Sequence, residues 1–242
     1  MLENVLDYEQ DLFLQLNGAH SLFGNQFMWL YSGKIAWIPV AFLFVVILSC
    51  KNRKHWKETL LIFAAIALVI TFCDQFSSGF CKPFFSRFRP THHPDFMNEV
   101  KTVFDYRGGR YGFISSHAAN AFGFATLTSL IFRYHFYSVV LYIWATMNAY
   151  SRIYLGVHFI TDIVPGIMAG LFFGWIVYKM YVYIRRKAIP DKAVSADIRC
   201  EDTRNLRSGL NLILYILILT IVMMAIISTL YALDVIPALT VK

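Results

Sequence analysis

Apolar residues along the chain are gathered into six long runs, and polar residues are concentrated in the segments between them. The runs occupy approximately residues 27–50, 59–80, 113–132, 136–151, 161–184 and 210–233. Most approach the roughly 20 apolar residues with which an α-helix crosses a bilayer, where lipid offers the backbone no hydrogen-bond partners. The pattern predicts an all-α, polytopic membrane bundle of six transmembrane helices.

The residues before the first run have an amphipathic pattern. Leu2, Leu6 and Phe13 recur near helical spacing, while acidic residues of the same segment lie on the other side. We expect residues 1–26 to form an interfacial segment that lies on the membrane. This acidic start lacks the basic region of a cleavable signal peptide, so insertion is expected to depend on the internal runs.

Composition and charge support a membrane protein and indicate its orientation. With 57% hydrophobic and 15% charged residues, the chain is neither an ordinary soluble domain nor a disordered one. The formal net charge of +7 does not indicate a nucleic-acid partner, because the cations lie in short segments between apolar runs. Cytoplasmic loops of membrane proteins are rich in Lys and Arg. The segments after the first, third and fifth runs are therefore expected to be cytoplasmic, with both termini on the outer side.

Three polar segments on the predicted outer side contain the residues of chemical interest. They contribute Lys82, Arg87 and Arg89; Ser115, Ser116 and His117; and Arg152, His158 and Asp162. Loops outside the cytoplasm are normally poor in cations, so this concentration suggests an anionic ligand.

The local patterns of these segments favour anion binding. Prolines directly after Lys82 and Arg89 bias both cations toward extended backbone at the mouth of the second predicted helix. Ser115 and Ser116 are good N-cap residues for the third, where free amides and the helix dipole attract an anion. If a helix follows Gly156, residues 158 and 162 share one face, so a carboxylate can accept a hydrogen bond from an imidazole.

These groups together are suited to phosphoryl transfer. The reaction requires neutralisation of charge on the phosphoryl oxygens, a nucleophile and a proton for the leaving oxygen. A neutral imidazole held by a carboxylate can attack phosphorus, and a protonated one can act as an acid. This chemistry requires no metal or cofactor, and no cysteine spacing suggests a zinc site. A structural histidine pair, or half of a metal site, is the competing interpretation.

The spacing K-x6-R-P, then S-x-H, then S-R-x5-H-x3-D resembles the three signature motifs of the type 2 phosphatidic acid phosphatase (PAP2) superfamily, over roughly residues 27–184. The resemblance implies that Lys82, Arg89 and Arg152 bind phosphate, with Ser115 and the amide of Ser116 completing the cradle. It implies that His158 is the nucleophile, oriented by Asp162, and that His117 protonates the leaving alkoxide. A PAP2-like membrane domain at 27–184 would then be followed by a basic cytoplasmic loop at 185–209 and an additional helix and tail at 210–242.

One position departs from the family pattern. The second motif usually has glycine directly before its histidine, and this chain has Ser116 there. The backbone N–H is kept, but the side chain takes up room, so the pose of a phosphate is expected to differ. Asp74 lies inside an apolar run, where an acid generally faces protein or water, and is expected to pair with a basic residue of the site or to lie near the interface.

The resemblance implies an integral membrane lipid phosphatase of the cytoplasmic (inner) membrane, with its active site on the extracytoplasmic side and a membrane lipid phosphate as substrate. Lipid A is favoured by likeness to bacterial members of the family. Undecaprenyl diphosphate is the principal alternative, followed by phosphatidate and phosphatidylglycerol phosphate. A transporter or binding protein for anionic lipids would use the same cations. Metal-dependent hydrolysis through the histidines is a further alternative, and the sequence leaves the oligomeric state open.

Overall fold

The computed structural model describes residues 2–52, 55–189 and 196–239, and these residues are mainly helical. The principal helices are α1 (Leu2–Asn17), α2 (Leu22–Ser32), α3 (Ile38–Lys51), α4 (Trp56–Asp74), α5 (Lys82–Phe85), α6 (Ser116–Phe132), α7 (His135–Tyr154), α8 (Ile160–Ala188) and α9 (Ala196–Ala232). A π-helical segment, Gln75–Cys81, joins α4 to α5 without a break. The extended backbone predicted at Lys82 is therefore wrong, because Pro83 lies in the first turn of α5, where its missing N–H costs nothing, whereas Arg89 is extended as predicted. The all-α class predicted from the sequence is confirmed.

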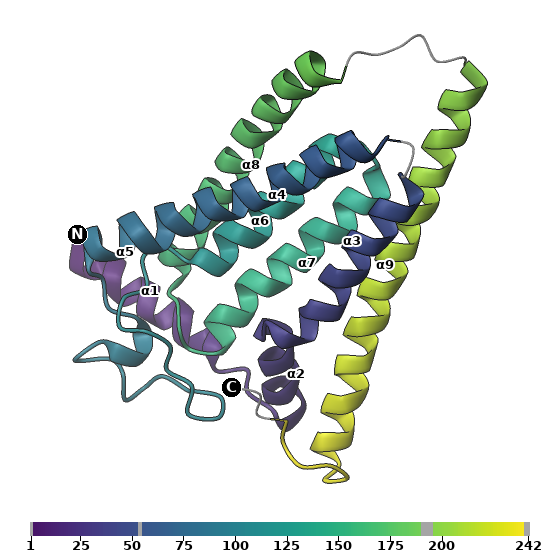
Figure 1. Cartoon of the computed structure of the whole chain (residues 1–242). Coiled ribbons are helices and arrows are strands. Elements are labelled where there is room, and N and C mark those ends of the chain that lie inside the picture. The colour runs from purple at the N-terminus through teal and green to yellow at the C-terminus, as the bar shows by residue number, and fades with distance from the viewer. Residues whose placement is uncertain (1, 53–54, 190–195, 240–242) are drawn as a thin grey trace.

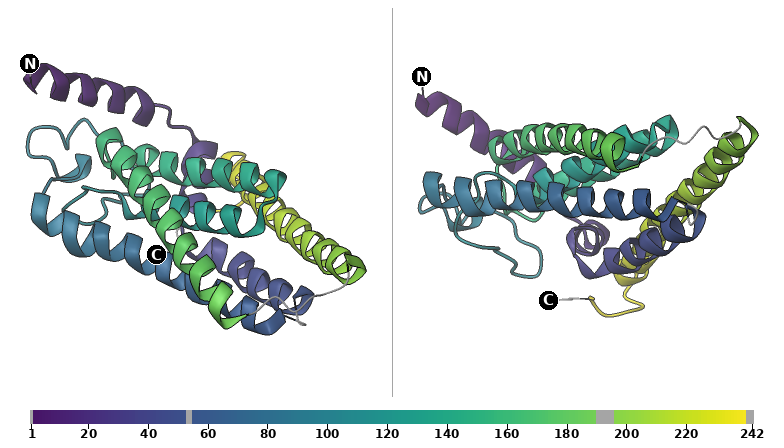
Figure 2. Two further views of the ribbon diagram at one scale, coloured as in Figure 1. Left: turned by 90° about the horizontal axis from the view of Figure 1, so that it is seen from above. Right: turned by 45° about the horizontal axis from the view of Figure 1, so that its top comes forward.

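The long helices form a bundle with α1 across one end (Figure 1). α6 packs against α4, α7 and α8, whereas α9 lies at the edge against α2 and α3. Figure 2 shows α1 at the periphery of the bundle, where it contacts α7 and α8. The irregular segment 86–115 lies at the same end as α1, whereas α3, α6 and α8 end, and α4, α7 and α9 begin, at the other. This arrangement separates the basic junctions from the polar motifs, as the predicted topology requires.

Length and composition identify fewer membrane spans than predicted. Among the described residues, three helical stretches are long and apolar enough to cross a membrane: Trp56–Phe85, Ile160–Ala188 and Arg204–Ala232. α2 with the following helical stretch adds a fourth if the bent pair is one span. α6 has only 17 residues, and α7 includes several polar ones, although both lie inside the bundle. The protein is a multi-pass membrane protein, but the count of six remains a prediction.

The first predicted span, 27–50, is broken. Leu22–Ser32 and Ile35–Lys51 meet at an angle of 65°. Gly33 ends α2, donating its N–H to the carbonyls of Leu30 and Trp29. The apolar run continues across this position, so hydrophobicity alone gave no sign of the break. The turn carries Ser32 and Lys34 toward the polar end of the bundle.

Two other predicted segments also differ in the structure. The charged stretch 185–209 is largely helical, since α8 extends to Ala188 and α9 begins at Ala196; residues 190–195 lie outside the described part of the chain. Arginine is a good helix former, so charge does not prevent α9 from extending beyond its apolar run. The amphipathic segment predicted at 1–26 contains helix α1, but residues 22–26 already belong to α2.

Small residues allow α6 and α8 to approach closely. Gly166, Gly170 and Gly174 recur every four residues on α8 and face α6. A Cβ atom at Gly170 would lie 2.5 Å from the carbonyl oxygen of Ala119 and 2.9 Å from the backbone nitrogen of Gly123. Close backbone contact of this kind is a usual source of helix association in membranes. It brings the N-terminal ends of α6 and α8, which bear the second and third motifs, next to each other.

Candidate active site

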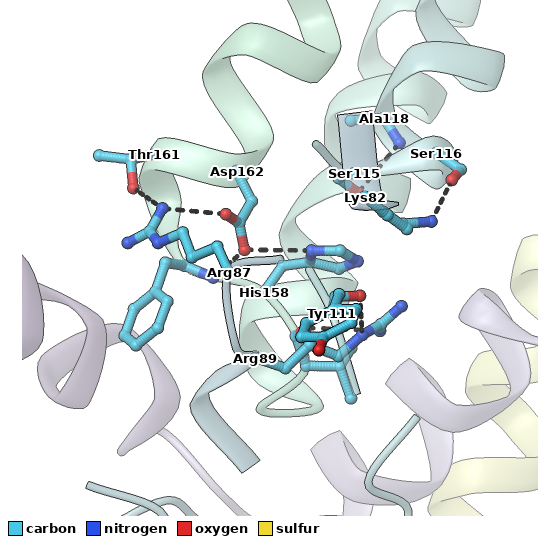
Figure 3. Close-up of polar contacts among 12 residues, drawn as sticks. Lys82, Arg87, Arg89, Tyr111, Ser115, Ser116, Ala118, His158, Thr161 and Asp162 are labelled. Carbon is cyan, nitrogen blue, oxygen red and sulfur yellow. Dashed lines mark hydrogen bonds and ion pairs between the residues drawn. The ribbon is translucent and has the colours of Figure 1, made fainter. Parts of the chain in front are cut away.

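The three polar segments predicted from the sequence meet at one end of the bundle. α5 supplies Lys82, the irregular segment supplies Arg89, and the first turn of α6 supplies Ser116 and His117. The third segment, at the end of α7 and the start of α8, supplies Arg152, His158 and Asp162. Figure 3 shows His158 between Asp162 and the side on which Lys82 and Arg89 lie.

His158 and Asp162 form the predicted pair, but not on one face of a helix, because His158 lies before the first residue of α8, Ile160. The Nδ1 atom of His158 lies 3.3 Å from Oδ2 of Asp162, and the two side chains are 1% and 0% exposed. Asp162 is in the first turn of α8, and its Oδ2 also accepts the backbone N–H of Phe159 at 3.1 Å. Because Nδ1 faces the carboxylate, Nε2 is the ring nitrogen left for a ligand.

The surroundings of His158 favour the neutral imidazole. Burial lowers its pKa well below the usual value, and the nearby positive charges of Arg89, Arg152, Lys82 and Arg87 lower it further. A neutral ring that is hydrogen-bonded at Nδ1 has a free lone pair at Nε2. This is the protonation state that a nitrogen nucleophile needs.

Lys82 is held by two serines. Its Nζ atom donates to Oγ of Ser116 at 2.6 Å and to Oγ of Ser78 at 3.1 Å, and the two hydroxyls are 2.9 Å apart. Ser78 Oγ also lies 3.4 Å from Oδ1 of Asp74. Asp74 therefore contacts the site through the Ser78 hydroxyl, and the described residues show no ion pair between it and a basic residue.

The serine at the usual glycine position thus has a structural partner of its own. Ser116 directs its hydroxyl to Lys82, so its side chain is part of the cation's environment. Ser115 is fully buried and caps α6, its Oγ accepting the N–H of Ala118, while its own N–H donates to the carbonyl of Asp162 at 3.0 Å. The predicted N-cap is confirmed, and it ties the second motif to the third.

Two buried arginines lie around His158. Arg89 donates from Nε to the carbonyl of Tyr111 at 3.0 Å and from one terminal nitrogen to the carbonyl of Val157 at 3.4 Å. Arg152 donates to Oγ of Ser32 and, at 3.3 Å, to the hydroxyl of Tyr106. Neither arginine forms an ion pair among the described residues, and Nε of Arg152 has no hydrogen-bond partner there. Two buried guanidinium groups without a carboxylate partner are suited to bind an anion.

A short β-bridge positions the segment that carries Arg87 and Arg89. Phe88 pairs with Tyr111, with hydrogen bonds from Arg89 N to Arg110 O and from Gly112 N to Arg87 O. The bridge places Gly112 next to the His158–Asp162 pair, and a Cβ atom at Gly112 would be 2.8 Å from Oδ2 of Asp162. Only a glycine leaves room for the carboxylate here.

An apolar cavity of about 460 Å³ extends from the catalytic end into the bundle. Ser116 and His117 line it together with Lys34, Asp74 and Asn120, and most of the remaining lining is aliphatic or aromatic. His117 is also close enough to His158, Arg152 and Arg89 to interact electrostatically with each of them. The cavity therefore joins an apolar space to the group of cations and imidazoles.

Sequence reasoning missed several contributors to this site. Ser32 and Tyr106 are partners of Arg152 and come from segments outside the motifs, which no local pattern connects to it. Ser78 was detectable, since it lies four residues after Asp74 and four before Lys82 on continuous helical turns. In the same irregular segment, the guanidinium of Arg110 lies over the rings of Phe88 and Tyr111. His92 Nδ1 contacts the hydroxyl of Thr91, next to it in the chain.

The described residues contain no group of three or more His, Cys, Asp or Glu side chains arranged to hold a metal ion. The polar atoms of the site are instead mainly cationic donors, imidazoles and one carboxylate paired with an imidazole. Such a set is suited to an anion.

The chain is similar to several known membrane phosphatases. Residues 58–186 match the model of the PAP2 superfamily. The chain is similar to a lipid A 4'-phosphatase from Porphyromonas gingivalis (49% identity, over 77% of this chain and 78% of that protein). It is also similar to a lipid A 4'-phosphatase from Bacteroides thetaiotaomicron (40% identity, 74% and 79%). Its fold resembles the crystal structure of a transmembrane PAP2-type phosphatidylglycerolphosphate phosphatase from Bacillus subtilis, with a TM-score of 0.56 at 22% identity, over 76% of this chain and 89% of that one.

Proposed function

Because the chain belongs to the PAP2 superfamily and is a phosphoric ester hydrolase, we propose that it removes a phosphate from lipid A. The observation that carries the proposal is the buried His158–Asp162 pair, which faces a group of cations beside an apolar cavity. The two relatives named above, which share 49% and 40% identity with it, are lipid A 4'-phosphatases.

The proposed reaction begins with attack on phosphorus by Nε2 of His158. Asp162 holds the ring by Nδ1 and stabilises the positive charge that the ring gains as the nitrogen–phosphorus bond forms. Lys82, Arg89 and Arg152 hold the phosphoryl oxygens, and the free amides at the start of α6, including that of Ser116, add to this cradle. His117 gives a proton to the leaving sugar oxygen as the phosphorus–oxygen bond breaks.

A water molecule then completes the reaction. It attacks the phosphohistidine on His158, and the neutral His117 formed in the first step accepts its proton. The nitrogen–phosphorus bond breaks, inorganic phosphate leaves, and both histidines return to their starting states. The oxidation state of phosphorus does not change in either step, so no redox partner is required.

The cavity supports a lipid as the substrate. Its apolar walls continue from His117 into the bundle, so a phosphate in the cradle can be attached to a molecule with a hydrocarbon part. Burying a hydrocarbon chain stabilises binding by about 0.8 kcal/mol per methylene group. A water-soluble phosphate ester would gain nothing from this surface.

The orientation and membrane are also part of the proposal. The basic junctions near Arg133 and Arg185 lie at the end of the bundle away from the site, and the positive-inside rule assigns that end to the cytoplasm. The active site then opens on the periplasmic side of the inner membrane. The basic stretch 185–209, most of which lies within α8 and α9, belongs to the cytoplasmic side, and α9 is an additional helix at the edge of the PAP2 domain.

Phosphate release by the purified full-length protein tests both activity and substrate. We expect release from lipid A to exceed release from undecaprenyl diphosphate and from phosphatidate, and lipid A left intact would exclude this substrate. His158→Asn and His117→Asn should each lower kcat by at least about a thousandfold while thermal unfolding in detergent is unchanged. Activity that survives in His158→Asn would remove it as the nucleophile. A transporter for anionic lipids would release no phosphate from any of the three lipids.

A further inference from the structure

The N-terminal helix α1 reaches the histidine–carboxylate pair through a chain of charges. Glu9 is buried on α1, and its Oε2 lies 2.7 Å from a terminal nitrogen of Arg87. The other terminal nitrogen of Arg87 lies 2.9 Å from Oδ1 of Asp162 and 2.5 Å from the hydroxyl of Thr161. Glu9 Oε1 in turn accepts hydrogen bonds from the hydroxyl and the backbone N–H of Thr161. Figure 3 shows Arg87 between Thr161 and Asp162, on the side of the carboxylate away from His158.

The two oxygens of Asp162 have separate partners. Oδ2 faces His158 and the N–H of Phe159, whereas Oδ1 faces Arg87. The orientation of the carboxylate therefore depends on where the guanidinium lies. Arg87 is 28% exposed, with a long side chain that has many rotamers in the absence of a second partner. Glu9 and the ring of Phe159, 4.8 Å away, hold it against Asp162.

Glu9 also offsets the charge of Arg87. A cation beside Asp162 with no second anion would draw electron density from the carboxylate and weaken its ability to stabilise a positive imidazole. A second carboxylate at 2.7 Å shares the guanidinium and reduces this effect. The salt bridge is partly buried, so solvent screens it less than a surface pair.

Other contacts hold α1 in place independently of Glu9. Phe13 is fully buried, with its ring centre 5.4 Å from that of Phe159 and 5.7 Å from that of Phe96. The amide nitrogen of Asn17 donates to the carbonyls of Lys101, Ile153 and Tyr154. Residues 9, 13 and 17 follow one another at four-residue spacing, so one face of α1 is attached to the active-site loops. Replacing Glu9 should thus leave the helix docked.

We propose that Glu9 is a positioning residue for the reaction. It acts through Arg87 to keep the Asp162 carboxylate oriented toward Nδ1 of His158. The proposal rests on the function proposed for His158 and Asp162. It makes α1 part of the catalytic unit, whereas the sequence indicated an interfacial segment outside it.

The test compares Glu9→Gln with Asp11→Asn in the full-length protein, by steady-state phosphate release from lipid A in detergent micelles. Gln keeps the size of Glu and its hydrogen bonds to Thr161, and loses the charge. We expect kcat to fall roughly tenfold, with KM within twofold, and thermal unfolding unchanged. Asp11 is exposed on the same helix, so Asp11→Asn makes the same change in net charge and should behave as wild type.

A double-mutant cycle identifies the route of the effect. In an Arg87→Gln background, Glu9→Gln should lower kcat by less than twofold, because the group through which it acts is absent. The acidic limb of the pH–rate profile should also move to lower pH in Glu9→Gln, since the uncompensated charge of Arg87 lowers the pKa of His158 further. The ionisable groups that interact electrostatically with His158 are Asp162, Arg87, Arg89, Lys82, Arg152 and His117.

Two outcomes would overturn the inference. Wild-type kcat in Glu9→Gln would show that the charge has no part in the reaction. An equal loss in the presence and absence of Arg87, together with a lower unfolding temperature, would assign Glu9 a purely structural role. Failure of the proposed function gives a different result, namely phosphate release that survives in His158→Asn. That result would also remove the basis of the inference about Glu9.

Discussion

Gly112→Ala tests whether the His158–Asp162 contact depends on the backbone that lies against it. The β-bridge fixes this backbone, since the N–H of Gly112 donates to the carbonyl of Arg87 at 2.9 Å. An alanine Cβ would lie 2.8 Å from Oδ2 of Asp162, 3.2 Å from Cγ of Arg89 and 3.5 Å from Nδ1 of His158. The added methyl group therefore meets three parts of the proposed machinery at once.

The expected magnitude follows from these distances. To reach an ordinary contact of 3.4 Å, the carboxylate oxygen must move by about 0.6 Å. Its present distance of 3.3 Å to His158 is already long, so a displacement of this size breaks the hydrogen bond. Hydrogen bonds to charged groups contribute about 1.5–3 kcal/mol, and each 1.36 kcal/mol corresponds to a tenfold change in rate. We expect kcat to fall by roughly 10–150-fold.

The assay is phosphate release at saturating lipid, with Gly109→Ala as the matched control. A Cβ atom at Gly109, three residues earlier in the same segment, would meet nothing within 4 Å. Gly109→Ala should keep wild-type kcat, and both variants should keep the same KM within about threefold. A Gly112→Ala protein with wild-type kcat would refute the reasoning, because it would mean that the pair tolerates displacement or does not limit the reaction.

Three further predictions concern the cradle, the pH dependence and the bundle. Ser116→Gly restores the usual family residue. It should change KM by less than about tenfold in phosphate-release assays, because Lys82 keeps its hydrogen bond to Ser78. Loss of all activity would contradict this prediction. The pKa of His158 is lower in the folded protein than in the unfolded chain, so the neutral side chain stabilises the fold above about pH 6.5, and this stabilisation is lost as the pH falls toward the folded-state pKa. Between pH 7.5 and pH 5, the unfolding temperature should therefore decrease less in His158→Gln than in wild type. Equal decreases in the two proteins would contradict this prediction. Gly170→Ala should force α6 and α8 apart, costing about 1–3 kcal/mol, and lower the unfolding temperature in detergent, whereas an unchanged temperature would exclude tight packing there.

The sequence determined which reactive and charged groups the candidate site contains, because its motifs are local. Lys82 and Arg89 lie in one short segment, and only three residues separate His158 from Asp162, although His158 lies just before α8 rather than on its first turn. The hydrophobic runs likewise determined the helical class and the membrane environment, since the backbone in lipid must satisfy its own hydrogen bonds. Family resemblance added the order of the three motifs along the chain.

Only the tertiary structure decided how distant segments complete this site. The break after Ser32 is invisible in an apolar run, because hydropathy does not record the direction of a helix, yet it brings Ser32 to Arg152. Close packing of α6 on α8 joins the second motif to the third. Glu9 reaches Arg87 across 78 residues of sequence, a separation at which neither periodicity nor spacing carries information. Local patterns specify which groups a segment offers, whereas the packing of the helices specifies which of those groups meet.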